Sequence, residues 1–359
     1  MLSQMNIPKL RKEKTVKKYH EYELSDDYAY VDQPDNILDV LRDPKKLLPE
    51  VKKYLDENNK LTEEYFKDTK NIQKKIFDEI KSKIKLEDES LKFKDERYYY
   101  WNKTVKIGNY PKYLRQKIGT SNEEIYFDGD EEKKLSGAKY FGVGAISVSH
   151  DDQLMAYSLD LRGSEYYDIY LRDLSTGKLI EDKIENTSGS VTWSLDSKSY
   201  FYTPLDKFHR SKKIYRHILG TPAEDDILIF EEKDDSFSVS ISLSSDEKFL
   251  IITSSDSNTV EEYFFSEKDK EIKPKLFQAR KKGVKYSIDS WKNYWYIHTN
   301  ENAMDYQVLR CDHKDIKKLE IFIPSKDETV IGGFDFLDDY ILRGEKSDAI
   351  PKLFIRNLH

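Results

Sequence analysis

The sequence predicts a mainly β protein made of about six β-propeller blade units, preceded by an N-terminal helical segment. The first observation is a unit of short alternating strands separated by polar turns, which is clearest between Ala145 and Ile180. The second is recurrence: similar units begin at Ser190 and Ser240, with weaker copies near Tyr286 and Ile331. Their spacing of roughly 45 residues is the length of one four-stranded blade.

The N-terminal helical segment is expected to cover residues 1–88, with most of residues 1–35 extended. From Leu47 the apolar spacing fits a helix entered through Pro49, which is tolerated in a first turn because its missing N–H would have no partner there. A second helix follows, capped by Asp68 or Thr69. Its apolar stripe consists of Ile72, Ile76, Phe77, Ile80 and Ile84.

Residues 89–359 are predicted to form the propeller. Arg97–Trp101, Tyr113–Lys117 and Glu124–Phe127 alternate as the strands of a first blade. The sixth unit begins at Ile331 and has reached only Lys352–Arg356 when the sequence stops, so we expect a C-terminally incomplete propeller. An open blade edge is an aggregation hazard. Either the chain is a fragment, or another element covers that edge.

Composition narrows the class of protein. Charged residues make up 35% and aromatic residues 13% of the chain, and the aromatic residues concentrate in strand-like runs, which excludes a disordered polyelectrolyte. The net charge of -7 with interspersed signs argues against a nucleic-acid partner. No apolar run is long enough for a membrane span. The single cysteine, Cys311, favours a reducing compartment, and we expect a cytoplasmic protein.

A search for catalytic residues in the sequence finds none. No G-x-S-x-G is present to form a nucleophile elbow, and no phosphate-binding glycine loop occurs. The histidines have no i, i+4 spacing typical of a zinc pair; they are His20, His150, His209, His217, His298, His313 and His359. We therefore predict no catalytic, cofactor-binding or metal-binding residue in this chain, and no cofactor.

Acidic clusters have two interpretations each. Residues 128–132 (Asp-Gly-Asp-Glu-Glu) resemble part of a calcium loop but lack the distal glutamate, which favours a solvated turn. The pairs Asp151–Asp152, Asp246–Glu247 and Asp338–Asp339 recur at equivalent places in their units. They could form a ring of carboxylates, but hairpin turns, in which Asp bonds its own backbone, are the favoured interpretation.

Two further stretches could bind a ligand. Trp291, Tyr294, Trp295 and Tyr296 could stack on one, although alternating aromatic residues on blade strands more often pack between blades. The basic stretch His209–Lys213 is predicted to be a solvated connection, with docking of an acidic partner as the alternative.

Several motifs together resemble the prolyl oligopeptidase family of serine peptidases, in its oligopeptidase B branch. In the N-terminal part they are Tyr54-Leu55, Glu57-Asn58, Thr62, Ile80–Ile84, Asp88–Ser90, Tyr98–Trp101 and Tyr110–Tyr113. In the blades they are Ile184–Gly189, Trp193, Phe201–Thr203, Tyr215–His217, Leu219–Thr221, Asp225-Asp226, Phe230–Glu232, Arg280–Tyr286 and Ile297–Asn300. The resemblance covers nearly the whole chain, and it departs from the family pattern where Tyr30 replaces a tryptophan.

The resemblance implies a seven-bladed propeller seated over an α/β-hydrolase domain of the same polypeptide, on which the helical segment packs. The propeller would admit short peptides and exclude folded proteins, and a Ser-Asp-His triad would cleave basic peptides after Arg or Lys. In that family the triad lies downstream of the propeller, so no catalytic residue is carried over and this chain is not expected to be catalytic alone. Two alternatives stay open: a free-standing propeller that acts as a binding scaffold, and the same enzyme class with cleavage after proline.

Overall fold

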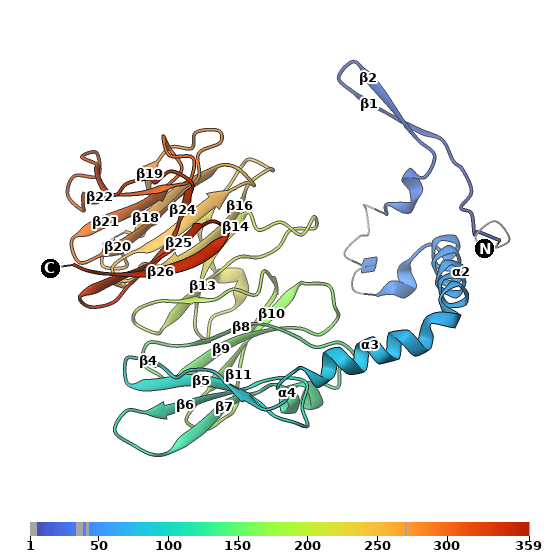
Figure 1. The fold of residues 1–359 in the computed structure, drawn as a ribbon, viewed down its shortest axis with the longest axis horizontal. Coiled ribbons are helices and arrows are strands. Elements are labelled where there is room, and N and C mark those ends of the chain that lie inside the picture. The colour runs from blue at the N-terminus through green and yellow to red at the C-terminus, as the bar shows by residue number, and fades with distance from the viewer. Residues whose placement is uncertain (1–5, 34–38, 41–42, 270, 359) are drawn as a thin grey trace. The chain divides into compact units, whose positions relative to one another are not determined.

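The computed structural model describes residues 6–33, 39–40, 43–269 and 271–358, and it is mainly β, as predicted (Figure 1). The chain divides into two compact units. The first unit contains Met1–Gly142 and Leu161–Ser164, and the second contains Val143–Asp160 and Glu165–His359. Six sheets of the propeller-blade type follow one another along the sequence, one in the first unit and five in the second.

The first unit begins with a two-stranded hairpin, β1 (Thr15–Tyr19) and β2 (Tyr22–Asp26). The backbone of these residues is extended, as predicted, but their pairing into a hairpin was not predicted. The turn between the strands places His20 at a φ of 53°, a left-handed conformation that non-glycine residues seldom adopt. Because the turn carries no glycine or asparagine, the sequence gives no hairpin signal there. Short 3-10 turns follow at Ala29–Val31 and Pro44–Lys46.

Two helices confirm the predicted helical segment. Helix α2 (Pro49–Tyr65) has its proline in the first turn, and the 3-10 turn Lys67–Thr69 connects it to α3 (Lys70–Ser82). Thr69 occupies the N-cap position of α3 but makes no capping bond, because its hydroxyl donates to the carbonyl of Phe66 at 2.8 Å. The expected side-chain cap is therefore not formed.

Blade 1 completes the first unit. Its strands are β3 (Asp88–Glu89), β4 (Phe93–Asp95), β5 (Tyr98–Thr104), β6 (Lys112–Lys117) and β7 (Glu123–Asp128), in the order β3-β5-β6-β7 with β4 also paired to β5. The three predicted strands correspond to β5, β6 and β7. Helix α4 (Gly129–Ser136) follows directly after β7.

The second unit contains five antiparallel sheets, numbered here as blades 2 to 6. Blade 2 consists of β8 (Gly142–Val148), β9 (Leu154–Asp160), β10 (Tyr167–Asp173) and β11 (Leu179–Thr187). Blade 3 consists of β12 (Thr192–Trp193), β13 (Ser199–Tyr202), β14 (Lys213–Ile218) and β15 (Ile227–Glu231), with a 3-10 turn at Ala223–Asp225. Blade 4 consists of β16 (Ser238–Leu243), β17 (Leu250–Ser255), β18 (Val260–Phe265) and β19 (Lys275–Gln278).

Blade 5 consists of β20 (Tyr286–Trp291), β21 (Tyr294–Thr299), β22 (Gln307–Asp312) and β23 (Glu320–Ile323). Blade 6 has three strands, β24 (Thr329–Phe336), β25 (Tyr340–Ser347) and β26 (Ile350–Asn357). The blades of the second unit thus begin where the sequence repeats predict them. In blades 2 to 6 the strands pair in chain order, so each of these blades is a simple meander.

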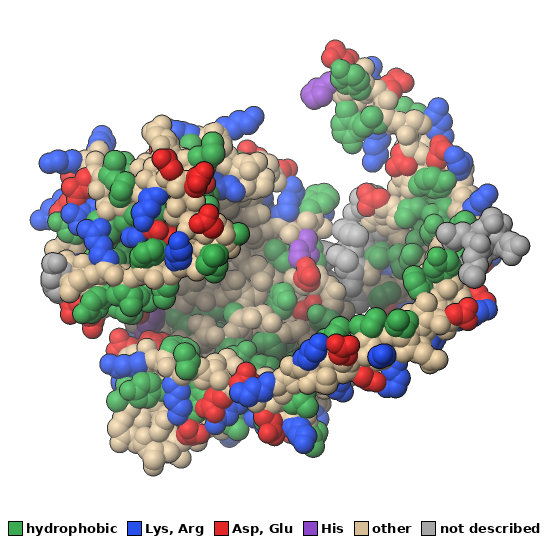
Figure 2. Space-filling view, in the orientation of Figure 1, with side chains coloured by type: hydrophobic (Ala, Val, Ile, Leu, Met, Phe, Trp, Pro, Cys, Tyr) green, Lys and Arg blue, Asp and Glu red, His purple; other side chains and the backbone are tan. Residues whose placement is uncertain are grey.

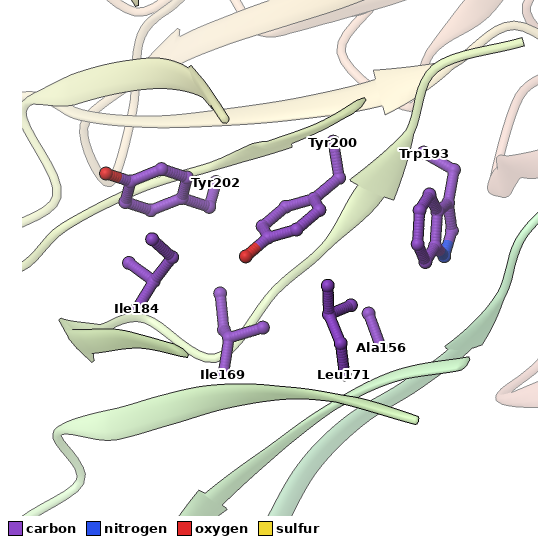
Figure 3. Close-up of a cluster of buried hydrophobic side chains, with 7 residues drawn as sticks. All are labelled: Ala156, Ile169, Leu171, Ile184, Trp193, Tyr200 and Tyr202. Carbon is purple, nitrogen blue, oxygen red and sulfur yellow. The ribbon is translucent and has the colours of Figure 1, made fainter. Parts of the chain in front are cut away.

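Each apolar core of the second unit lies between two successive blades. Figure 3 shows the one in which Ile169, Leu171 and Ile184 of blade 2 meet Trp193 and Tyr200 of blade 3. Equivalent clusters join blades 3 and 4, blades 4 and 5, and blades 5 and 6. Blades 3, 4 and 5 each bury one face on the preceding blade and the other on the following blade, which explains why their strands are apolar on both faces.

Candidate functional site

The first strands of the blades form a wall with a distinctive composition. Along β16, Ser238, Ser240 and Ser242 are exposed while the intervening Val239 is buried. In β20, Ser287 is exposed between the buried Tyr286 and Ile288. This period of two gives β16 and β20 an apolar face toward the blade core and a face of small hydroxyl side chains away from it.

Hydrogen bonds place these first strands next to one another. The indole of Trp193 on β12 donates to the carbonyl of Ser147 on β8 at 3.1 Å. The hydroxyl of Thr192 donates to the carbonyl of Ile241 on β16 at 3.0 Å. The first strands of blades 2, 3 and 4 therefore lie side by side.

Two hollows open along this wall. The first has a volume of about 200 Å³ and is lined mainly by hydroxyl side chains, those of Ser188, Ser190, Thr192, Thr203, Ser211 and Ser240. The second, of about 250 Å³, is lined by Ser242, Ser287, Asp289 and His298 among others. His298 donates from Nε2 to the carbonyl of Ile331 at 2.7 Å, and its burial lowers the pKa of the imidazole, so the ring there is neutral at physiological pH.

A charged cluster lies at the strand ends of blades 3 and 4. The Arg280 guanidinium contacts Glu232 at 2.6 Å and Glu261 at 2.8 Å, and it stacks over the Phe237 ring at 3.9 Å. Burial by itself would raise the pKa of Glu232, but hydrogen bonds from Ser254, the Asp234 amide and Arg280 lower it overall. Both carboxylates are thus held ionised, and the cluster carries one net negative charge.

A cavity of about 460 Å³ adjoins this cluster and shares Glu232 with it. Its lining contains four basic and four acidic side chains: Arg210, Lys212, Lys213, Lys233, Asp206, Glu231, Glu232 and Asp235. Arg210 binds Asp206 at 3.1 Å, and Lys212 binds Asp235 at 3.0 Å. Charges of opposite sign lie side by side there, which gives a polar surface without a strong field of either sign.

Each acidic pair of the sequence lies in a tight turn between two strands. Asp151 accepts from the Ser149 hydroxyl at 2.6 Å, and Asp246 accepts from that of Ser244 at 3.1 Å. Asp152 and Glu247 follow with positive φ values of 60° and 54°. Leu337 and Tyr340 exchange backbone hydrogen bonds around the third pair. The hairpin interpretation is confirmed.

The aromatic stretch of blade 5 packs as expected. Trp295 is fully buried against Phe249, with ring centroids 4.6 Å apart, and Trp291 stacks on Phe336 of blade 6 at 5.3 Å. Tyr296 is buried in the cluster between blades 5 and 6, whereas Tyr294 is 37% exposed. Packing between blades is confirmed for Trp291, Trp295 and Tyr296.

Two other predictions are wrong in detail. Residues 128–132 are not a solvated turn, because Asp128 caps α4 by accepting from the amides of Asp130 and Glu131. Lys112 binds the same carboxylate at 2.5 Å, so it offers no calcium site. The basic loop is not simply solvated either, because the Lys212 side chain is only 12% exposed and paired with Asp235.

Sequence reasoning missed a fully buried histidine. Both ring nitrogens of His217 on β14 contact carboxylate oxygens at 2.7 Å, Nε2 that of Asp182 on β11 and Nδ1 that of Asp226. The three residues are far apart in sequence, so no spacing rule could have found them. Within the described ranges, no three His, Cys, Asp or Glu side chains are placed to hold a metal ion.

The architecture of meander blades with a polar inner wall can be compared with known families. The family model for the prolyl oligopeptidase N-terminal β-propeller domain matches residues 8–359. The chain belongs to this family. The wall and the charged cluster described above therefore belong to a prolyl oligopeptidase propeller domain.

Curated relatives of this propeller domain are peptidases by name. Dipeptidyl aminopeptidase BI from Pseudoxanthomonas mexicana is 29% identical over 366 residues, which cover 96% of this chain and 48% of the relative. Protease 2 from Moraxella lacunata is 28% identical over 343 residues, covering 91% and 48%. The chain thus spans about half the length of these relatives.

Solved structures share the fold of this prolyl oligopeptidase propeller. Oligopeptidase B from Leishmania major has a TM-score of 0.88 at 20% identity and covers 99% of this chain and 51% of that one. Oligopeptidase B from Trypanosoma brucei, with covalently bound antipain, has a TM-score of 0.84 at 24% identity, covering 98% and 51%. None of the helices formed by the described residues is long and apolar enough to cross a membrane.

Proposed function

We propose that this propeller domain controls the entry of short peptides to an α/β-hydrolase domain of the same polypeptide, in an enzyme of the oligopeptidase B branch. The hydrolase domain would cleave after Arg or Lys with a Ser-Asp-His triad, and the residues of this chain would not be catalytic alone. A cytoplasmic location and the domain boundary between residues 88 and 89 belong to the same proposal.

The wall of first strands is the observation that carries the proposal. Small hydroxyl side chains such as Ser240 and Ser242 leave space beside the strands and offer hydrogen bonds to a peptide backbone. An extended peptide can pass such a surface without being retained, because its backbone groups exchange one polar partner for another. A folded protein is wider than a single extended strand, which gives the wall its selectivity.

The exposed face of α3 supports a partner domain. Ile72, Ile76, Phe77 and Ile80 are each more than half exposed, with exposed fractions of 58%, 51%, 62% and 59%. Figure 2 shows hydrophobic side chains gathered along this helix. A contiguous apolar stripe of this kind marks a surface that another element covers, and we assign it to the hydrolase domain. The net charge of -7 favours basic peptides as substrates.

A bulky substitution on the wall tests the gating role. In the full-length protein, Ser240→Trp is expected to lower kcat/KM for a short Arg peptide more than for a single-residue arginine ester. Thr176→Trp, in an exposed turn of blade 2 away from the wall, is the matched control and should change neither value. Equal losses for both substrates would refute gating.

Substrate class and the hydrolase domain are tested separately. Reading the transcript past the codon for His359 should show a G-x-S-x-G segment, which residues 1–359 lack, followed by Asp and His. Peptides differing only in Arg, Lys or Pro at the cleaved position decide between the two peptidase specificities. Cleavage by the purified 359-residue chain that persists through contaminating-protease controls would contradict the proposal. A stop codon after His359 would favour the binding scaffold.

A further inference from the structure

A second cavity lies on the border of blades 5 and 6, apart from the first-strand wall. It has a volume of about 290 Å³ and is lined by the basic side chains of Lys292, Arg310 and Arg356 together with aromatic rings that include Tyr294 and Phe322. This volume is at the lower end of the range for small-molecule pockets. The cavity therefore suits a ligand of about the size of one ring with a single substituent.

Aromatic rings hold the two guanidinium groups in place. Arg310 Cζ lies 4.8 Å from the centroid of the Tyr294 ring and 5.1 Å from that of Phe322. Arg356 Cζ lies 4.4 Å from the Phe322 ring, and its Nη1 donates to the Phe322 carbonyl at 3.2 Å. Stacking of this kind fixes a guanidinium while leaving its other N–H groups available to an acceptor. Less rotamer entropy is then lost on binding.

The charges in the cavity do not balance. No carboxylate belongs to its lining among the described residues. At its rim, Glu320 pairs with Arg310, and Asp339 lies 3.9 Å from Lys292, which is at the outer limit of an ion pair. Within the described part of the chain, no carboxylate forms an ion pair with Arg356. Three cations against two rim carboxylates leave one positive charge, which a monoanion would neutralise.

We propose that this cavity binds a small monoanionic ligand in which a carboxylate or phosphate group is carried on a flat ring. The oxyanion accepts from the guanidinium of Arg356, and the ring lies among the aromatic side chains. This is a binding site of its own and does not depend on the peptidase role proposed above. Bidentate contact with a planar oxyanion is the recognition for which a guanidinium is shaped.

Titration of the protein as the organism makes it, by calorimetry with three probes, tests the proposal. Benzoate supplies a carboxylate on a ring, methyl phenyl phosphate supplies a monoanionic phosphate on a ring, and benzamide is the neutral control with the shape of benzoate. We expect one of the anions to bind with a Kd in the millimolar range or below, to weaken at high salt, and to bind more tightly than benzamide. The tighter anion identifies the class of ligand.

Substitutions locate the site. Arg356→Gln should weaken anion binding about tenfold or more, because it removes a charge-assisted hydrogen bond. Arg356→Lys should weaken anion binding less, since it keeps the positive charge and loses only the pair of parallel N–H donors of the guanidinium. Arg172→Gln in blade 2, where Arg172 stacks on Tyr157 at 5.1 Å, is the matched control and should leave the affinity unchanged. Equal binding of benzamide, no binding of either anion, or unchanged affinity in Arg356→Gln with a native melting curve would each overturn the proposal.

Discussion

Replacing His217 with glutamine is expected to destabilise the contact between blades 2 and 3. The ring is fully buried, and its nitrogens contact Asp182 and Asp226, each at 2.7 Å. Because a carboxylate only accepts hydrogen bonds, both ring nitrogens must carry protons, and the side chain is an imidazolium. Asp182 also accepts from the Gly220 amide at 2.9 Å, and Asp226 from the Tyr202 hydroxyl at 2.7 Å.

The expected magnitude follows from these contacts. Two charge-assisted hydrogen bonds contribute about 1.5 to 3 kcal/mol each. Removing the cation from a buried pair costs about 3 to 5 kcal/mol, because it leaves uncompensated charge behind. His217→Gln leaves two such carboxylates, so we expect a loss of about 3 to 5 kcal/mol in the free energy of unfolding. This is a large part of the total for a domain.

The effect should depend on pH. Burial by itself lowers the pKa of His217, but the hydrogen bonds with Asp182 and Asp226 outweigh it, and the pKa is raised overall. The stabilisation is therefore complete below the pKa of an exposed histidine, about 6.5, and is lost as pH rises through the higher folded-state pKa. The difference in unfolding free energy between the two proteins should therefore decrease as pH rises through the folded-state pKa of His217.

Urea unfolding followed by tryptophan fluorescence, repeated across the pH range, measures this difference. Asp182→Asn combined with His217→Gln removes one of the two uncompensated charges. The double variant should therefore lose less than the sum of the two single losses. A loss below about 1 kcal/mol at neutral pH, the usual worth of an ordinary hydrogen bond, or one that does not vary with pH, would refute the imidazolium.

Four other substitutions give sharp outcomes. Tyr200 has a buried hydroxyl with no hydrogen-bond partner among the described residues, so Tyr200→Phe should be neutral or stabilising. Tyr202→Phe should cost about 1 to 3 kcal/mol of unfolding free energy, because Asp226 loses a donor. Equal shifts in the melting temperature of the two variants would contradict this. Burial raises the pKa of Glu262 to about 8. The unfolding free energy of the wild type should therefore fall by up to roughly 1.4 kcal/mol per pH unit as pH rises from the unfolded-state to the folded-state pKa. Glu262→Gln should not show this fall. Parallel unfolding profiles for the two proteins would show that Glu262 is ionised. Arg280→Met leaves Glu232 and Glu261 without their cation and should lower the unfolding free energy by about 3 to 5 kcal/mol, measured by denaturant titration. An unchanged unfolding free energy would mean that solvent already screens the two carboxylates.

The sequence was informative where local chemistry sets the structure. Serine and aspartate at Ser149-x-Asp151 and Ser244-x-Asp246 mark each tight hairpin, because both side chains bond within the turn itself. Alternation between small polar and apolar residues along β16 similarly predicts which face is buried. The blades were therefore predictable without any knowledge of tertiary contacts.

Other features could not be predicted for definable reasons. The β1–β2 hairpin turns at His20 without the glycine or asparagine typical of a two-residue hairpin turn, so the usual hairpin signal is absent from the sequence. Helix α4 has only eight residues and an acidic first turn that reads equally well as a cation loop. The partners of His217 and of Arg280 come from different blades, and only the folded chain brings them together.

The position of each apolar cluster between two successive blades has a consequence for how the second unit loses structure. Interactions of this kind connect nearest neighbours, so the free energy behaves as a sum over adjacent pairs, as in a linear array of coupled repeats. A substitution at Ile169 should lower hydrogen-exchange protection in blades 2 and 3 and leave blade 6 unaffected. The interface between two successive blades can then accumulate substitutions, or open transiently, while the interfaces between the other blades keep their stability.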